Sequence, residues 1–360
     1  MEFPSVVLTG VLSLPYFRCR SLSVIYGFPG SDRMQHFLWT AWNFIKLYIL
    51  GAWYMAKELL VPHKKPTGIG PQNGRVAIVT GGGRGIGLQT VKQFLLQDMT
   101  VIIAGRDVTS LQKAVDRIRS EGITSGRTEC LELDLMSLNS VRELVREFLK
   151  LNLPLHVLVN NAGIMFWPEE ITEDGFESHW SVNYLGHFLL THLLYPHLRK
   201  SSSKEMPSRI VNLTSSVHYI GQINFADING RKYYNAQAAY AQSKLAQLMF
   251  TRILDKHIKA MDGNILVNAV HPGVVATELF QKVAWARLFP GLARKFLKKP
   301  EQGSDTVVYV ALSSEITNGG NYYENCSITW PSSFSSNPKH LRSLWDISCS
   351  QVNVKEFGVL

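Results

Sequence analysis

The amino-acid sequence predicts an α/β fold: one doubly wound parallel sheet with helices on both faces. From residue 75 onward, short apolar runs rich in Val and Ile alternate with longer stretches of helical period. The runs are continuous rather than alternating in polarity, which indicates strands that are buried on both sides of the sheet. A glycine-rich turn between the first strand and the first helix is a second observation in favour of this fold.

Seven segments have the composition of strands, namely 75–80, 100–104, 129–133, 155–160, 209–214, 265–270 and 321–323, and helical stretches follow most of them, among them 86–97, 137–151 and 240–261. With 360 residues, 46% of them hydrophobic, the chain is long enough for one core of about 250 residues with appendages. We divide it into an N-terminal extension (1–33), a hydrophobic membrane-anchor helix (34–62), a linker (63–74), the α/β domain (75–330) and a C-terminal tail of unassigned role (331–360).

Residues 37–56 contain a single charge, Lys46, in twenty positions. A helix of this length reaches about 30 Å, the thickness of a hydrocarbon core, and several aromatic residues lie toward its ends. The lysine leaves two interpretations open: a spanning anchor, or a hairpin or interfacial helix. A cleaved signal peptide is the rival interpretation, but no persuasive cleavage site is evident.

The net charge of +9 would suit a nucleic-acid binder, but its placement argues against one. Residues 281–300 carry six basic residues and no acidic one, interleaved with apolar residues at roughly helical spacing. We therefore predict a basic amphipathic lid or membrane-contact segment over 282–299; an ordinary surface helix is the alternative. The four cysteines form no CxxC pair and no metal-spaced cluster with histidines, so we expect neither a disulfide scaffold nor a metal site.

The sequence TGGGRGIG (80–87) follows the first predicted strand and opens the first predicted helix. Glycines allow the backbone to approach a pyrophosphate closely, and a helix N-terminus offers that anion free N–H groups. The order of strand, loop and helix therefore predicts a Rossmann-like dinucleotide site. Arg106, after the second strand, and Arg84 are placed to pair with a 2′-phosphate, which favours NADP(H) over NAD(H). The alternative is that both arginines are solvated surface charges. Asp134 is placed to accept from the adenine amino group.

Tyr240 and Lys244 are four residues apart and so share one helical face. Hydride transfer to a carbonyl leaves an alkoxide that needs a proton, and a phenol with a pKa of about 10 is a poor acid near neutral pH. A nearby ammonium favours phenolate, so we expect Lys244 to lower the pKa of Tyr240. Ser216 is placed to donate a hydrogen bond to the same oxygen, with Ser215 as the alternative because the doublet leaves the register open.

The order of the motifs is more specific than any one of them. NNAG (160–163) follows the fourth predicted strand, and Asn183 lies in the next helix. The serine doublet follows the fifth strand, YAQSK (240–244) comes next, and HPG (271–273) follows the sixth strand. Together they resemble the short-chain dehydrogenase/reductase family from about residue 75 to 325. The resemblance implies a catalytic tetrad of Asn183, Ser216, Tyr240 and Lys244, in which Asn183 holds a water of a proton relay. The implied cofactor-binding positions are Thr80, Gly81, Gly83, Arg84, Gly85, Ile86, Gly87, Arg106, Asp134, Leu135, Asn161, Ala162, Gly163, Tyr240, Lys244, Pro272, Gly273 and Thr277.

Within that family, the segments 183–191, 238–246 and 271–279 are similar to the retinol-dehydrogenase-like branch. Flanking sequences such as PLHVLVNNAG, DGFE and GGNYYEN look closest to members that act on long-chain polyprenols. The resemblance implies an NAD(P)-dependent oxidoreductase for polyprenol/polyprenal or dolichol/dolichal pairs, with retinol or steroid conversion as the alternative.

We therefore expect a lipophilic small molecule and a membrane as partners, and no nucleic acid; a homodimer is left open. The expected location is the endoplasmic reticulum membrane with a cytosolic catalytic domain, and a lipid droplet or secretion are the alternatives. A non-catalytic nucleotide-binding signalling or secreted protein is the alternative from another class. Such a protein has no physical need for the four tetrad residues together.

Overall fold

The computed structural model describes residues 31–261, 263–279, 291 and 296–359. Within these residues an eight-stranded sheet has the order β3-β2-β1-β4-β5-β6-β7-β8. The first seven strands pair in parallel, and only β8 pairs antiparallel, with β7. The chain winds outward from β1 to β3 and then crosses back to β4, so the strand order reverses between β1 and β4. The predicted doubly wound α/β fold is confirmed.

The strands are β1 (Val76–Thr80), β2 (Thr100–Gly105), β3 (Arg127–Glu132), β4 (Val157–Asn160), β5 (Ser208–Leu213), β6 (Ile265–His271), β7 (Tyr322–Glu324) and β8 (Ser327–Thr329). Each of the seven predicted strands is present, with ends within two residues of the predicted ones. β8 was not predicted, because a three-residue strand on the sheet edge has no apolar run to reveal it.

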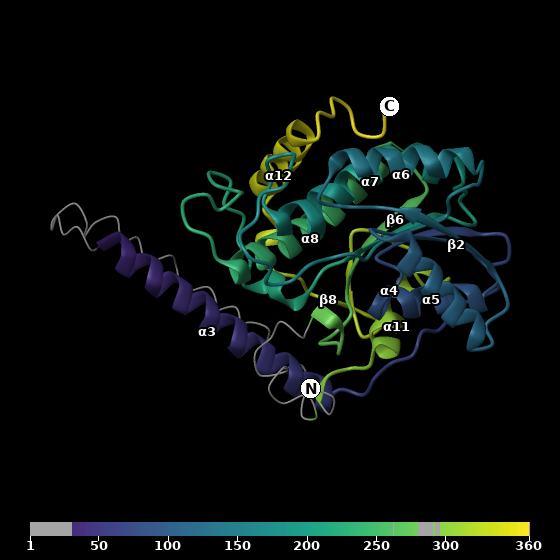
Figure 1. Ribbon diagram of the computed structural model, residues 1–360, viewed down its shortest axis with the longest axis horizontal. Helices are drawn as coiled ribbons and strands as arrows, with labels where there is room; N and C mark the ends of the chain where they lie inside the picture. The colour runs from purple at the N-terminus through teal and green to yellow at the C-terminus, as the bar shows by residue number, and fades with distance from the viewer. Residues whose placement is uncertain (1–30, 262, 280–290, 292–295, 360) are drawn as a thin grey trace.

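Helices cover both faces of this sheet (Figure 1). One face carries α4 (Gly85–Leu96), α5 (Val108–Ser120) and α11 (Pro300–Leu312), and the other carries α6 (Leu138–Lys150), α7 (Gly186–Lys200) and α8 (Ala236–Ala260). Alternate side chains of each strand enter the two layers, so Ile78 of β1 joins one core and its neighbour Val79 the other. The sheet is thus buried on both sides, as its continuous apolar strands require.

The two edges of the sheet differ from its centre. β3 forms one edge and exposes Arg127, Glu129 and Glu132. β8 forms the other edge, with three residues. Charged side chains and a very short strand are features that discourage pairing with a foreign strand.

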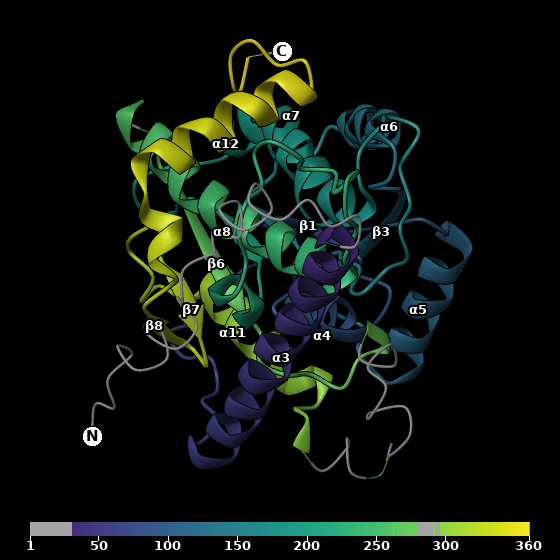
Figure 2. The same ribbon diagram turned by 90° about the vertical axis from the view of Figure 1, so that its left-hand side faces the viewer.

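The C-terminal residues are part of the domain rather than a tail. They form a short 3₁₀ turn, η4 (Ser333–Ser336), and then α12 (Pro338–Gln351), which packs against α8 (Figure 2). Leu344 has no exposed surface, and Trp345 and Phe357 pack against the same core. The predicted boundary at residue 330 is therefore wrong, because the Ser-rich composition of this segment conceals a regular apolar helix face.

Near the N-terminus, α3 (Ser31–Leu60) contacts α8 and the 3₁₀ turn η2 (Ser216–Tyr219), while its first half extends beyond the domain (Figures 1 and 2). The predicted helix over 34–62 is thus present, and its role at a membrane stays a prediction. Across the described part of the chain, no helix combines the length and the hydrophobicity needed to cross a membrane. Most of the predicted segment 282–299, and nearly all of the extension 1–33, lie outside the described residues.

Candidate active site

A cleft of about 470 Å³ lies at the carboxyl ends of the parallel strands, where the strand order reverses. This is the position at which open α/β sheets bind ligands. Five segments line it: the glycine loop after β1, the turn after β2, the residues after β3, the NNAG turn after β4 and the loop after β6. Tyr240 and Lys244, both on α8, also line the cleft, as do Leu213 and Thr214 at the end of β5 and Val182.

All of the predicted cofactor positions line this cleft except Thr80 and Gly273. Thr80 lies beneath it: the N–H groups of Asn161 and Ala162 each donate to its Oγ1 at 2.9 Å, which fixes the NNAG turn. Gly273 (φ +93°) faces the side chains of Glu58 and Lys298, which leave no room for a Cβ atom there. Both residues therefore shape the surrounding loops instead of lining the cleft.

The glycine loop presents an open helix end to the cleft. No side chain caps the first turn of α4, so its N–H groups remain available to an anion. Gly85 has a φ of +54°, and a Cβ atom on Gly87 would collide with the carbonyl oxygen of Gly81. This close approach of backbone segments, beside an uncapped helix N-terminus, fits a bound dinucleotide pyrophosphate.

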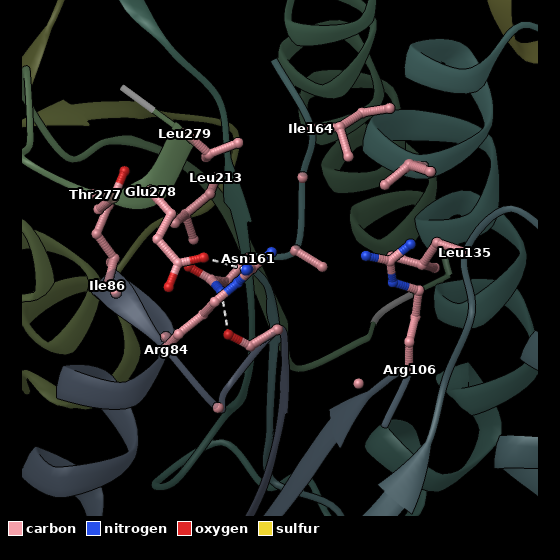
Figure 3. Close-up of a pocket in the computed structure, with 18 of the residues that line it drawn as sticks. Arg84, Ile86, Arg106, Leu135, Asn161, Ile164, Leu213, Thr277, Glu278 and Leu279 are labelled. Carbon is pink, nitrogen blue, oxygen red and sulfur yellow. Dashed lines mark hydrogen bonds and ion pairs between the residues drawn. The ribbon is translucent and has the colours of Figure 1, made fainter. Parts of the chain in front are cut away.

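Two arginines lie at different sides of this cleft (Figure 3). Arg84 forms an ion pair with Glu278, from the loop after β6. Arg106 lies across the cleft near Leu135 and, among the described residues, has no ion-pair partner. Glu278 was missed at the sequence level, because an acidic residue in a loop carries no signal of the cation it will meet.

Tyr240 is buried at the cleft, and its hydroxyl hydrogen-bonds to the side chain of Ser215. Burial raises the pKa of Tyr240 to about 12, and the bond to Ser215 opposes that rise. The serine that hydrogen-bonds to the phenol is thus Ser215, the alternative that the sequence left open, and the assignment of Ser216 as the catalytic serine stays a prediction. Ser215 precedes η2 in extended backbone conformation, whereas Ser216 is already its first residue, and this one-residue offset decides which hydroxyl meets Tyr240.

Lys244 is also buried, and its Nζ donates to the carbonyl oxygen of Leu213 at 2.7 Å and to Gln247 Oε1 at 2.9 Å. Desolvation lowers the pKa of this lysine to about 7. The expected lowering of the Tyr240 pKa by Lys244 is thus absent from this structure. The reason is that both groups lose water, and the ammonium is directed to β5 and to the next turn of α8.

Asn183 lies in the π-helical turn η1 (Trp180–Leu185) and does not line the cleft. Its Oδ1 accepts from the N–H of Ile164 at 2.8 Å, and its Nδ2 donates to Ile164 O and to Ser243 Oγ. The amide thus ties the segment after the NNAG turn to α8, one residue from Lys244. The proposed relay water at Asn183 stays a prediction.

This arrangement has known relatives. Residues 75–287 match the short chain dehydrogenase family. The chain belongs to the short-chain dehydrogenase family. A polyprenol dehydrogenase of Danio rerio is 41% identical over 317 residues, which cover 87% of this chain and 97% of that protein. A polyprenol dehydrogenase of Mus musculus is 44% identical, covering 78% and 84%. Retinol dehydrogenase 11 of Homo sapiens is 40% identical, covering 77% and 85%.

Solved structures agree with this assignment. An uncharacterized protein from Mycobacterium Paratuberculosis superposes with a TM-score of 0.68 at 29% identity, over 83% of this chain and all of that one. A Pseudomonas aeruginosa RhlG/NADP active-site complex gives a TM-score of 0.57 at 25% identity, over 74% and 98%. This short-chain dehydrogenase of the retinol-dehydrogenase-like branch is therefore an oxidoreductase that acts on CH–OH groups with a nicotinamide cofactor.

Apolar residues surround Tyr240 of this dehydrogenase. The ring of Phe166 meets the ring of Tyr240 edge-on, with centroids 5.6 Å apart, and Phe166 has a φ of +52°. A hydrogen bond fixes the backbone next to Phe166, since the N–H of Trp167 donates to Nε2 of buried His179 at 3.0 Å. The Nδ1 atom of His179 bonds to Glu177 at 2.7 Å. These residues carry no signal in the sequence, because their role depends on contacts between distant loops.

Proposed function

We propose that this short-chain dehydrogenase interconverts a lipophilic alcohol and its aldehyde, of the polyprenol/polyprenal or dolichol/dolichal type, with NADP(H) as the preferred cofactor. The observation that carries the proposal is the buried Tyr240, bonded to Ser215 at the cleft and enclosed by apolar side chains. The polyprenol dehydrogenases at 41% and 44% identity support this substrate class. Retinol dehydrogenase 11, at 40% identity, supports retinol as the second candidate.

Each residue near the reacting carbon has a distinct task in this proposal. Tyr240 Oη donates a proton to the substrate oxygen, or accepts one in the oxidative direction. Ser215 Oγ donates a hydrogen bond to the same oxygen as negative charge develops. Lys244 holds the ribose hydroxyls near the phenol, and Asn183 completes the path by which protons reach Lys244. A nicotinamide cofactor, when bound, supplies or accepts the hydride.

The preference for NADP(H) rests on Arg106. Its exposed guanidinium, without an ion-pair partner among the described residues, lies just after β2, where an adenosine ribose is recognised in this fold. A guanidinium favours a 2′-phosphate through charge-assisted hydrogen bonds. Arg84 is a weaker contributor, since its pairing with Glu278 must be broken before it can contact a phosphate.

We further propose that the outer face of α3 contacts a lipid surface. Five apolar residues at helical spacing form an exposed stripe: Leu38, Trp42, Ile45, Ile49 and Trp53. The polar residues Asn43 and Lys46 are instead buried against the protein. This pattern is the reverse of a water-facing helix and suits contact with an apolar phase. The cytosolic side of the endoplasmic reticulum is the proposed membrane, and a homodimer stays a prediction.

The purified enzyme, incubated in detergent with a panel of polyprenals, retinal and steroids, tests the proposed function. We expect NADPH-dependent reduction of polyprenals with a higher kcat/KM than for the other aldehydes and ketones. Faster turnover of retinal would favour the second candidate. Tight NADPH binding without turnover of any carbonyl compound would favour a non-catalytic nucleotide-binding protein instead.

A further inference from the structure

The apolar cluster around Tyr240 includes a residue from the N-terminal helix. Its buried members are Met165, Val217, Tyr240 and Ala241, and four partly buried residues pack against them: Leu47, Phe166, Ile220 and Leu279. Leu47 lies on α3, almost two hundred residues before Tyr240 in the sequence. The helix that looks like a simple membrane anchor therefore reaches the surroundings of the reacting group.

The end of α3 is fixed to the loops that build the cleft. Glu58 Oε1 accepts from the N–H of Val274 at 2.8 Å, and its carboxylate lies 3.6 Å from Nζ of Lys298. Lys57 Nζ donates to both carboxylate oxygens of Glu324 at 2.9 Å. Val274 directly follows Pro272 and Gly273, so this contact joins α3 to the loop that lines the cofactor cleft.

Aromatic and apolar packing strengthens the same attachment. The ring of Tyr54 meets the ring of His271 edge-on at 5.2 Å, and Leu50 and Tyr54 are buried together with Val274 and Leu297. Leu50 lies three residues after Leu47, so both belong to one face of α3. The position of Leu47 beside the tyrosine cluster is thus set by contacts along two turns of helix and not by Leu47 alone.

We propose that α3 is a structural part of the substrate site and that Leu47 forms an apolar wall for the part of the substrate next to its hydroxyl or carbonyl carbon. Phe166 forms a neighbouring wall against the ring of Tyr240. The inference rests on the proposed function, because an apolar wall next to the proton donor is useful only for a lipophilic alcohol or aldehyde. It makes Leu47 a specificity-determining residue and not a membrane anchor residue.

Substitutions at two positions of α3 separate these roles. Leu47→Ala and Leu47→Trp change the inner face, while Ile45→Ala and Ile45→Trp change the outer face two residues away, where Ile45 is 46% exposed. The assay measures kcat and KM for a polyprenal in detergent, together with the Kd of NADPH. We expect Leu47→Trp to lower kcat/KM at least about tenfold and Leu47→Ala to raise KM several-fold. The Ile45 variants should stay within about twofold of wild type, and NADPH should bind all four variants equally.

A short soluble aldehyde such as hexanal, assayed alongside, distinguishes the two proposals. If wild type reduces hexanal but no long-chain aldehyde, the proposed function fails, and altered hexanal kinetics in Leu47→Trp would still support the wall. If wild type reduces polyprenal and Leu47→Trp has unchanged kinetics with intact NADPH binding, the proposed function stands and the wall is refuted. If the Leu47 and Ile45 variants lose activity equally, the effect belongs to the helix as a whole, and Leu47 has no special contact with the substrate.

Discussion

Nζ of Lys244 donates to the carbonyl oxygen of Leu213 at 2.7 Å, so the closest protein partner of this buried ammonium is the end of β5. Its second partner, Gln247, is neutral. No carboxylate among the described residues pairs with Lys244 to offset the loss of water, and burial lowers its pKa to about 7. This lysine, to which we assign a role in the reaction, is therefore a source of instability in the protein without cofactor.

Replacing Lys244 by Met should stabilise the cofactor-free protein in a pH-dependent manner. Below pH 7 the lysine is charged in both the folded and the unfolded state, so wild type bears the full cost of burying the charge. That cost falls as pH rises from about 7 toward the ordinary lysine pKa near 10.5, because the folded state has lost its proton first. We expect the free energy of unfolding of Lys244→Met to exceed that of wild type by about 1–3 kcal/mol at pH 6, and by less at pH 9. Urea unfolding at the two pH values measures this; an equal difference at both would contradict it.

Replacing Tyr240 by Phe should remove the proposed proton donor while keeping the ring that packs on Phe166. We expect kcat to fall by about 10²–10⁴ with the Kd of NADPH unchanged. Thermal unfolding should change little, because only the hydrogen bond to Ser215 is lost. Turnover near the wild-type rate would mean that another group protonates the substrate.

The serine doublet allows a matched pair of substitutions. Ser215→Ala removes the hydroxyl that bonds to Tyr240, and we expect kcat to fall by about 10²–10³. Ser216→Ala changes the adjacent residue and should leave kcat within about threefold. Steady-state kinetics with NADPH in excess decide between them, and the opposite order of effects would identify Ser216 as the catalytic serine.

Replacing Arg106 by Ala tests the cofactor preference. Loss of a charge-assisted contact to the 2′-phosphate should reduce kcat/KM for NADPH about 10- to 100-fold and leave that for NADH nearly unchanged. Arg117→Ala, which removes an exposed arginine on α5, is the control for net charge. Equal losses of kcat/KM with NADPH and NADH would show that Arg106 contributes to folding, or that it binds a part of the nucleotide that both cofactors share.

The packing of the C-terminal helix α12 should contribute to the free energy of unfolding. Leu344→Ala removes a side chain with no exposed surface where α12 packs against the core, and should lower the free energy of unfolding by about 2–5 kcal/mol. Arg342→Ala, an exposed position on the same helix, should change it by less than about 0.5 kcal/mol. Chemical denaturation measures both. A negligible effect of Leu344→Ala would mean that 331–360 is a tail after all.

The features that could be predicted from the sequence are those that depend on local pattern. Buried parallel strands are continuous apolar runs, and the glycine loop has a fixed spacing, so the sheet and most of the cleft lining were predictable. The serine of the doublet that hydrogen-bonds to Tyr240 was not predictable, because it depends on where η2 begins. The helix α12 was missed because serines separate its few buried residues, and their partners lie on α8, far away in the sequence.

The two edges of the sheet have a consequence for crowding on a lipid surface. The charged side chains of β3 and the three-residue length of β8 discourage either edge strand from pairing with a strand of another molecule. Copies of the enzyme gathered at high local density on the lipid surface proposed for α3 should therefore avoid joining sheet to sheet into fibres.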